Sequence, residues 1–175
     1  MIMASNLSEY SSPRALDPDT VLHLQRLVLL NFDSRDAYRA AETRAKDVRL
    51  IALAQHTFLE RQIQAVTLQN ILWDDGSEST SRVYIETVDH ALLDRIRTTP
   101  ATSDTAIIRE LLDIELYVYL CYEKVISAIK GRGIRQLLSE QASQIDELKI
   151  TLSELLQSRD AQAPAADNNT LPVGS

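Results

Sequence analysis

Four polar residues of this sequence belong to the types that bind metal ions in proteins: Glu115, Glu60, His56 and Asp33. Carboxylates supply hard, negatively charged oxygens and imidazole supplies nitrogen, a ligand set that suits iron or manganese. Glu115 is the most informative of the four because its neighbours at helical spacing are apolar or aromatic. The stripe that it interrupts consists of Ile108, Leu112, Glu115, Tyr119, Tyr122 and Ile126.

Glu115 admits three interpretations, because a bare carboxylate on an apolar helix face is costly. It binds a metal, it joins a buried hydrogen-bond network, or its stripe is partly exposed. A dimetal centre in a helical bundle takes a Glu from each of two helices and a Glu-x-x-His pair from each of the other two. This sequence lacks such pairs: His56 precedes Glu60 in the reverse order, and Ile63 stands where the histidine would follow.

The other candidate ligands have structural interpretations as well. His56 fits a core or boundary histidine, Glu60 fits a solvated helix face, and Asp33 fits a surface charge paired with a nearby arginine. One polar residue interrupts the apolar stripe near the middle of each long helix, and together they would form a mostly neutral polar layer. These residues are Asn31, His56, Glu115 and Gln141.

Helices must position these side chains, because the composition is that of an all-α protein. Only four glycines and five prolines occur among 175 residues, too few for a strand-rich fold. The periodicity predicts helices over residues 18–45, 48–72, 81–97, 105–130 and 134–157. In the second of these, the stripe expected to face inward is Val48, Ala52, His56, Leu59, Ile63, Val66 and Trp73.

The lengths of the connections predict how these helices are arranged. The first two long helices are joined by a tight link, a connection of about 30 residues follows, and the last two are again tightly linked. One long crossover between the second and third long helices is the ferritin-like arrangement of a four-helix bundle. We therefore expect such a bundle over residues 17–157, with the short helix 81–97 inside the crossover. Residues 1–16 are expected to form a flexible arm and 158–175 a disordered tail.

Composition excludes several classes of function. The net charge is −7 and no basic stripe interleaved with aromatics occurs, so nucleic-acid binding is not expected. No apolar run approaches the length of a membrane span and no secretory signal is visible, so we expect a cytoplasmic protein with no membrane contact. The single cysteine, Cys121, has no internal partner for a disulfide and lies on an apolar stripe.

The segments around these polar residues resemble an uncharacterised bacterial ferritin-like domain family over roughly residues 20–156. The resemblance rests on Asp33-x4-Tyr38-x2-Ala41-Glu42, on Gln55 to Gln62, on Ala106 to Glu115, and on Tyr122. It implies a ferritin-like four-helix bundle of unknown function. The family's fourth helix commonly carries an inward histidine near the position of Glu147. The residues that correspond to its recurring polar positions are Asp33, Tyr38, Glu115 and Tyr122.

Two functions remain in view. The missing Glu-x-x-His pairs favour a non-enzymatic bundle that self-associates or binds a protein partner, its metal site being degenerate. The alternative is a metal-binding or redox protein whose minimal carboxylate site uses Glu60 and Glu115, assisted by His56, Asp33 or Glu140, with iron or manganese. No residue is assigned a catalytic or organic-cofactor role. A homodimer is expected because the apolar surface exceeds what one bundle needs.

Overall fold

The computed structural model of the chain describes residues 16–74, 90–99 and 103–161, and these residues are almost entirely helical. No strand occurs among them, which confirms the all-α class expected from the composition. The expected arm (1–16) and tail (158–175) fall largely outside the described residues, as does the 81–89 part of the crossover helix. The helices are α1 (Pro18–Arg44), α2 (Val48–Asp74), α4 (Ala91–Thr98), α5 (Asp104–Ala128) and α6 (Arg132–Asp160).

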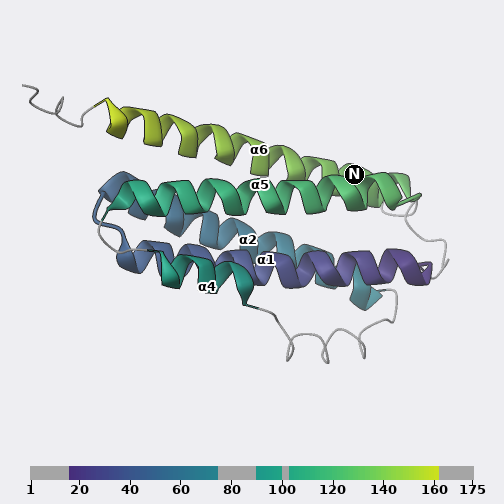
Figure 1. Ribbon diagram of the computed structural model, residues 1–175. Coiled ribbons are helices and arrows are strands. Elements are labelled where there is room, and N and C mark those ends of the chain that lie inside the picture. The colour runs from purple at the N-terminus through teal and green to yellow at the C-terminus, as the bar shows by residue number, and fades with distance from the viewer. Residues whose placement is uncertain (1–15, 75–89, 100–102, 162–175) are drawn as a thin grey trace, which may run out of the picture.

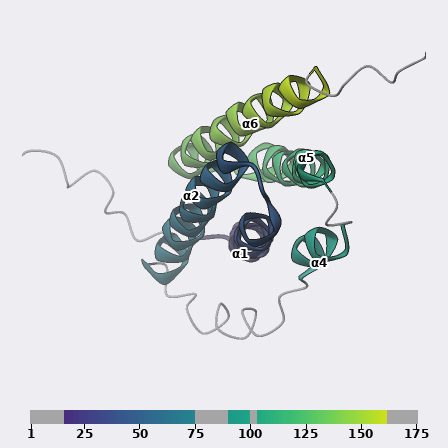
Figure 2. The same cartoon turned by 90° about the vertical axis from the view of Figure 1, so that its left-hand side faces the viewer.

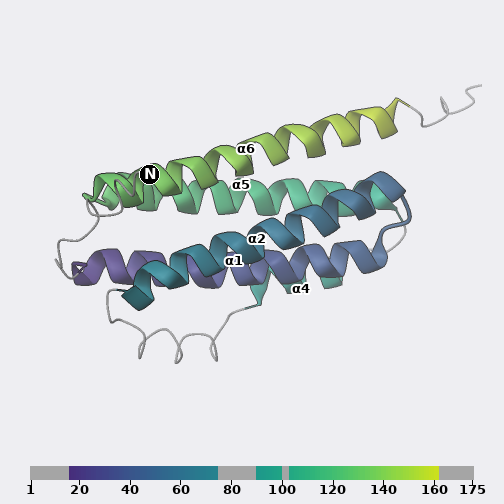
Figure 3. The same cartoon turned by 180° about the vertical axis from the view of Figure 1, so that it is seen from behind.

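The four long helices form two antiparallel hairpins that pack on each other, α1 with α2 and α5 with α6 (Figure 1). The second and third long helices, α2 and α5, run in the same direction (Figures 1 and 3). The end-on view shows α4 outside this set, against α1 and α5 (Figure 2). The structure thus has the parallel second and third long helices that one long crossover requires.

The helix boundaries follow the local signals in the sequence. Asp17 caps α1, with its carboxylate accepting from the Thr20 amide at 3.0 Å, and Ser103 caps α5 through the Ala106 amide at 3.3 Å. Asp47 caps α2 by accepting from the Arg49 amide at 2.7 Å. The last helix continues to Asp160, three residues beyond the end that the heptad pattern predicts.

Three long helices bury the stripes that the sequence predicts. The core is made mainly of leucine, isoleucine and alanine from α1, α5 and α6, closed by Leu92 and Ile96 of α4. Helical spacing predicts an inward stripe through Leu24, Asn31 and Tyr38 on α1 and one through Leu138, Ile145 and Leu152 on α6, and these residues are buried. On α5, the stripe through Ile107, Leu111 and Val118 and the stripe through Glu115 both contribute buried residues. The buried residues of α6 are Leu138, Gln141, Ala142, Ile145, Leu148, Leu152 and Leu155.

The stripe predicted to face inward on α2 is wrong: the helix is turned the other way. Its inner face carries Arg61 and Gln64 toward the core, although an apolar stripe lies on its outer face. The inner residues are Leu50, Ala54, Thr57, Arg61, Gln64, Ala65, Leu68 and Leu72. The apolar residues left outside, here called the α2 outer stripe, are Val48, Ala52, Leu59, Ile63, Val66 and Trp73.

A carboxylate from α5 anchors the turn between α1 and α2. Asp104 accepts hydrogen bonds from the backbone amides of Lys46 and Asp47 at 2.8 and 2.9 Å. The Arg159 guanidinium of α6 then joins the Asp47 and Asp104 carboxylates at 2.5 and 2.9 Å. Because three elements meet on these side chains, the rotation of α2 at its first turn is set by polar contacts as well as by packing.

The Arg159–Asp47 contact predicts a pH effect. The hydrogen bond from Arg159 is the largest cause that lowers the pKa of Asp47 to about 2. A carboxyl with a depressed folded-state pKa stabilises the fold above its unfolded pKa, and this contribution is lost as pH falls from ~4 toward ~2. Arg159→Met is expected to raise the pKa of Asp47 toward its ordinary value, measured by NMR titration of the carboxyl carbon.

The matched control for this titration is Lys149→Met, which removes a surface cation paired with Asp146 elsewhere on α6. It should leave the pKa of Asp47 unchanged. An unchanged Asp47 titration in the Arg159 variant would contradict the assignment of the low pKa to this contact.

Candidate functional site

A buried ion pair between α2 and α5 occupies the centre of the bundle. Arg61 and Glu115 have only 2% and 0% of their side-chain surface exposed, and Arg61 Nη2 donates to Glu115 Oε2. The second guanidinium nitrogen, Nη1, donates to Gln64 Oε1 at 2.7 Å. Gln64 Nε2 in turn donates to Gln144 Oε1 of α6 at 2.9 Å. A hydrogen-bonded chain therefore crosses the core from α5 through α2 to α6.

A second buried chain of hydrogen bonds joins α1, α5 and α6. Asn31 Nδ2 donates to the Leu27 carbonyl at 2.8 Å and contacts the Tyr122 hydroxyl at 2.6 Å. The Tyr122 hydroxyl donates to Gln141 Oε1 at 3.0 Å. Asn31, Glu115 and Gln141, three of the four stripe interruptions, are thus buried in the bundle interior, whereas His56 is not.

Burial dominates the electrostatics of this interior. It raises the pKa of Glu115, and the adjacent Arg61 guanidinium opposes that rise by favouring the carboxylate. Burial also raises the pKa of Tyr38 well above its usual range, with the Glu115 charge adding to the effect. Burial likewise raises the pKa of Tyr122 to about 12. The Tyr38 hydroxyl and the Glu115 carboxylate also interact through a side-chain hydrogen bond, which lowers the pKa of Glu115 and raises that of Tyr38.

His56 and Glu60 lie on the surface of α2, apart from this interior. The His56 ring is 70% exposed, and its Nδ1 lies 3.5 Å from Glu60 Oε2 one helical turn away. An i, i+4 pair on a solvated helix face contributes little to stability. The structure therefore separates these two candidate ligands from Glu115, which points into the core.

Asp33 serves as the N-terminal cap of α4. Its carboxylate oxygens accept the backbone amides of Leu92 and Leu93 at 2.9 and 3.1 Å, satisfying donors that have no partner inside the helix. At the other end of α4, the Arg44 guanidinium donates to the Ile96 and Thr99 carbonyls. Both caps come from α1, which holds the short crossover helix along its whole length.

Removing the Asp33 cap is expected to loosen α4 selectively. Asp33→Ala should lower the free energy of unfolding by about 1–2 kcal/mol, the usual range for a lost N-terminal cap. Hydrogen exchange at the Leu92 and Leu93 amides should accelerate strongly, because both lose their acceptor. The control is Asp36→Ala, a half-exposed partner of Arg35. Equal amide protection in the two variants would contradict the capping role.

The four predicted ligands do not converge on one point. Glu115 is paired with Arg61, Asp33 caps α4, and His56 with Glu60 faces solvent. Across residues 16–74, 90–99 and 103–161, no three His, Cys, Asp or Glu side chains gather as a metal-binding group. The interior carboxylate and both tyrosine hydroxyls are sealed from solvent, so this arrangement orders the core and offers no substrate a route to them.

Arg61 and Gln64 are the interior residues that the sequence analysis missed. Their signal was present as a second stripe on α2, in register with Leu50, Ala54 and Leu68. The α2 outer stripe was predicted to face inward in its place, because the residues of the outer stripe are more apolar. A further signal was Glu115 itself, since a buried carboxylate requires a cation or donors on a facing helix.

Comparison with known proteins adds no relative to this description: no protein-family model, no curated protein and no solved structure matches the chain. None of the helices in the described part of the chain has a stretch long and apolar enough to cross a bilayer.

Proposed function

We propose that this chain is a non-enzymatic, ferritin-like helical bundle that works by associating with protein surfaces, in the first place with a second copy of itself. The observation that carries the proposal is the α2 outer stripe. Three of its residues, Leu59, Ile63 and Trp73, have 58–65% of their surface exposed. Contiguous exposed apolar surface of this kind is typical of interaction sites.

The surroundings of the stripe favour a second copy as its partner. No charged residue occurs from Gln62 to Trp73, although one quarter of the chain is charged and its net charge is −7. The positions beside the second half of the stripe are neutral amides, such as Gln69 and Asn70, whereas Arg49, His56 and Glu60 lie beside its first half. Two α2 helices therefore meet across a two-fold axis without like-charge repulsion, and each covers the apolar residues of the other.

The ferritin-like type is supported by the direction of the helices and by the place of the polar interior. The long crossover makes α2 and α5 parallel, and Glu115 lies where such bundles build carboxylate sites. In this chain, the Arg61 guanidinium supplies the positive charge that a metal ion would otherwise supply to Glu115. This substitution is the reason for proposing that the metal site is degenerate.

One observation favours the alternative, a metal-binding or redox protein with a minimal carboxylate site. The Glu115 carboxylate and the Tyr38 hydroxyl, which share a side-chain hydrogen bond, place two oxygen atoms of the kind that iron or manganese binds side by side in the core. Iron or manganese would have to displace Arg61 from the carboxylate and recruit Glu60 from the edge of the helix.

Two measurements on the purified full-length chain separate these functions. Sedimentation equilibrium at micromolar concentration should give the mass of a dimer, and metal analysis after purification without chelator should find no stoichiometric iron or manganese. A monomer mass overturns the association proposal. Stoichiometric metal that disappears in Glu115→Ala establishes the alternative, and added Fe²⁺ or Mn²⁺ should then raise the thermal stability.

A further inference from the structure

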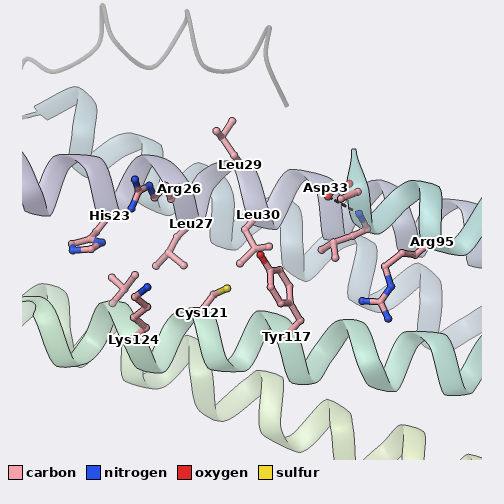
Figure 4. A pocket seen from close by; sticks show the side chains of 13 residues that line it. His23, Arg26, Leu27, Leu29, Leu30, Asp33, Arg95, Tyr117, Cys121 and Lys124 are labelled. Carbon is pink, nitrogen blue, oxygen red and sulfur yellow. Dashed lines mark hydrogen bonds between the residues drawn. The ribbon is translucent and has the colours of Figure 1, made fainter. Parts of the chain in front are cut away.

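A cavity opens between α1, α4 and α5, away from the α2 outer stripe. Its volume is about 620 Å³, within the usual size range of small-molecule sites. Its walls are mainly apolar, and Figure 4 shows their side chains converging from α1 and α5 onto the middle of the opening. The apolar residues of the wall are Leu27, Leu30, Leu92, Cys121 and Val125.

The charged residues of the cavity are divided between its two ends. At the end beside α4, here called the far end, Asp33 accepts from the amides of α4, and Arg95 pairs with Glu110 at 2.5 Å. At the near end, Arg26 and Lys124 approach from α1 and α5 (Figure 4). Neither of these two cations forms an ion pair with any residue in the described part of the chain.

His23 stands beside this cationic end and adds a ring nitrogen that can donate a hydrogen bond. The chain carries 25 acidic against 18 basic residues, and its surface acids commonly find arginine or lysine partners. Arg26 and Lys124, which have no ion-pair partner in the described part of the chain, therefore leave positive charge at one end of an apolar cavity, and this charge suits an external anion. The apolar walls require that this anion carries a hydrocarbon tail.

We propose that this cavity binds a single-chain carboxylate amphiphile, a free fatty acid. The carboxylate lies between the Arg26 guanidinium and the Lys124 ammonium, with His23 as an additional donor. The alkyl chain lies along the apolar wall from Val125 toward α4, where the buried Leu92 excludes water from it. At the far end, Arg95 and Asp33 already have partners, so they do not compete with Arg26 and Lys124 for the carboxylate.

Cys121 provides a reporter placed inside the proposed site. It is the single cysteine of the chain, it is half-buried, and it lines the cavity. Its rate of alkylation by neutral iodoacetamide measures access to the wall. Dodecanoate, used below its micelle concentration, is expected to slow this rate about tenfold at saturation. Dodecyltrimethylammonium, which has the same tail and the opposite charge, is expected not to protect.

Charge reversal at the near end tests the head-group contacts. The double variant R26E/K124E should raise the half-protecting concentration of dodecanoate by at least about tenfold, because two attractive head-group contacts become repulsive. The matched control is K130E/R132E, which reverses two exposed cations outside the cavity and should leave protection unchanged. Titration calorimetry of the Cys121→Ser chain with dodecanoate should give the same order of affinities.

Several outcomes overturn the proposal. Absence of protection by dodecanoate, equal protection by the cationic amphiphile, or equal loss in both double variants would each refute a carboxylate site at Arg26 and Lys124. Binding to anionic phospholipid vesicles without binding to free dodecanoate would replace the fatty-acid site by a membrane surface. Protection by dodecanoate that is lost only in R26E/K124E establishes the site.

Discussion

Arg61→Met is expected to lower the free energy of unfolding by about 3–5 kcal/mol, the usual cost of leaving one partner of a buried ion pair alone. Methionine keeps the unbranched apolar stem of arginine but lacks the guanidinium, so the loss comes mainly from the charge and its hydrogen bonds. The variant leaves the Glu115 carboxylate inside an apolar core, and Gln64 loses the guanidinium that it accepts from. The measurement is urea unfolding followed by circular dichroism.

The loss of unfolding free energy in Arg61→Met should increase with rising pH. Burial already raises the pKa of Glu115, and removing the guanidinium removes the main influence that lowers it. A group whose folded-state pKa lies above its unfolded value stabilises the fold most below the unfolded pKa, and stability falls as pH rises through the folded pKa. The variant should therefore be less destabilised near pH 5 than near pH 8.

Restoring neutrality provides the control for this prediction. The double variant R61M/E115L removes both charges and should recover most of the lost stability, because apolar replacements of buried ion pairs are commonly neutral or stabilising. Arg39→Met, at an exposed arginine of α1, should change stability by no more than about 0.5 kcal/mol. If R61M/E115L were as unstable as Arg61→Met alone, the cost would come from lost packing and not from an unpaired charge.

The second large effect concerns association. Ile63→Glu is expected to convert the proposed dimer into a monomer at micromolar concentration, because it places a carboxylate in the middle of the α2 outer stripe. Across a two-fold axis the two new charges face each other, so the interface loses apolar contact and gains repulsion together. Sedimentation velocity gives the mass, and unfolding in urea should show a fold that is otherwise intact.

The matched control for Ile63→Glu is Leu120→Glu on α5, which makes the same change at a residue of similar exposure, 56% against 65%. It should leave the dimer in place. If Leu120→Glu dissociates the dimer and Ile63→Glu does not, the interface lies on α5, where Leu116 and Tyr117 are also exposed. That result would refute the assignment to α2.

The inner and outer faces of α2 have a common explanation in the rotation of this helix. A buried carboxylate in the core of a helical bundle needs a cation beside it, and in this protein the Arg61 guanidinium is that cation. This supports a structural role for Glu115, in which the pair sets which face of α2 turns inward. The outer stripe is then left for a partner, so the polar interior and the apolar surface are two consequences of the same helix rotation.

The sequence by itself determined much of this protein: its all-α class, the long helices within a few residues, the helix starts at Asp17 and Asp47, and the inward stripes of α1, α5 and α6. For the start of α5 it offered Ser103 and Asp104 as alternative caps, and the structure has Ser103. These follow from short-range physics, because capping and helical periodicity depend on neighbours within a few positions. It also marked Glu115 as a carboxylate in need of a partner.

Only the tertiary structure decided the rotation of α2, the partner of Glu115, and the position of Asp33 at the start of α4. The hydrophobic pattern favoured the wrong face of α2, because it rewards burial of Ile63 and penalises burial of Arg61. That ranking reverses when a facing helix supplies the opposite charge. Such pairings join residues 54 positions apart, as in Arg61 and Glu115, and periodicity within one helix carries no information about them.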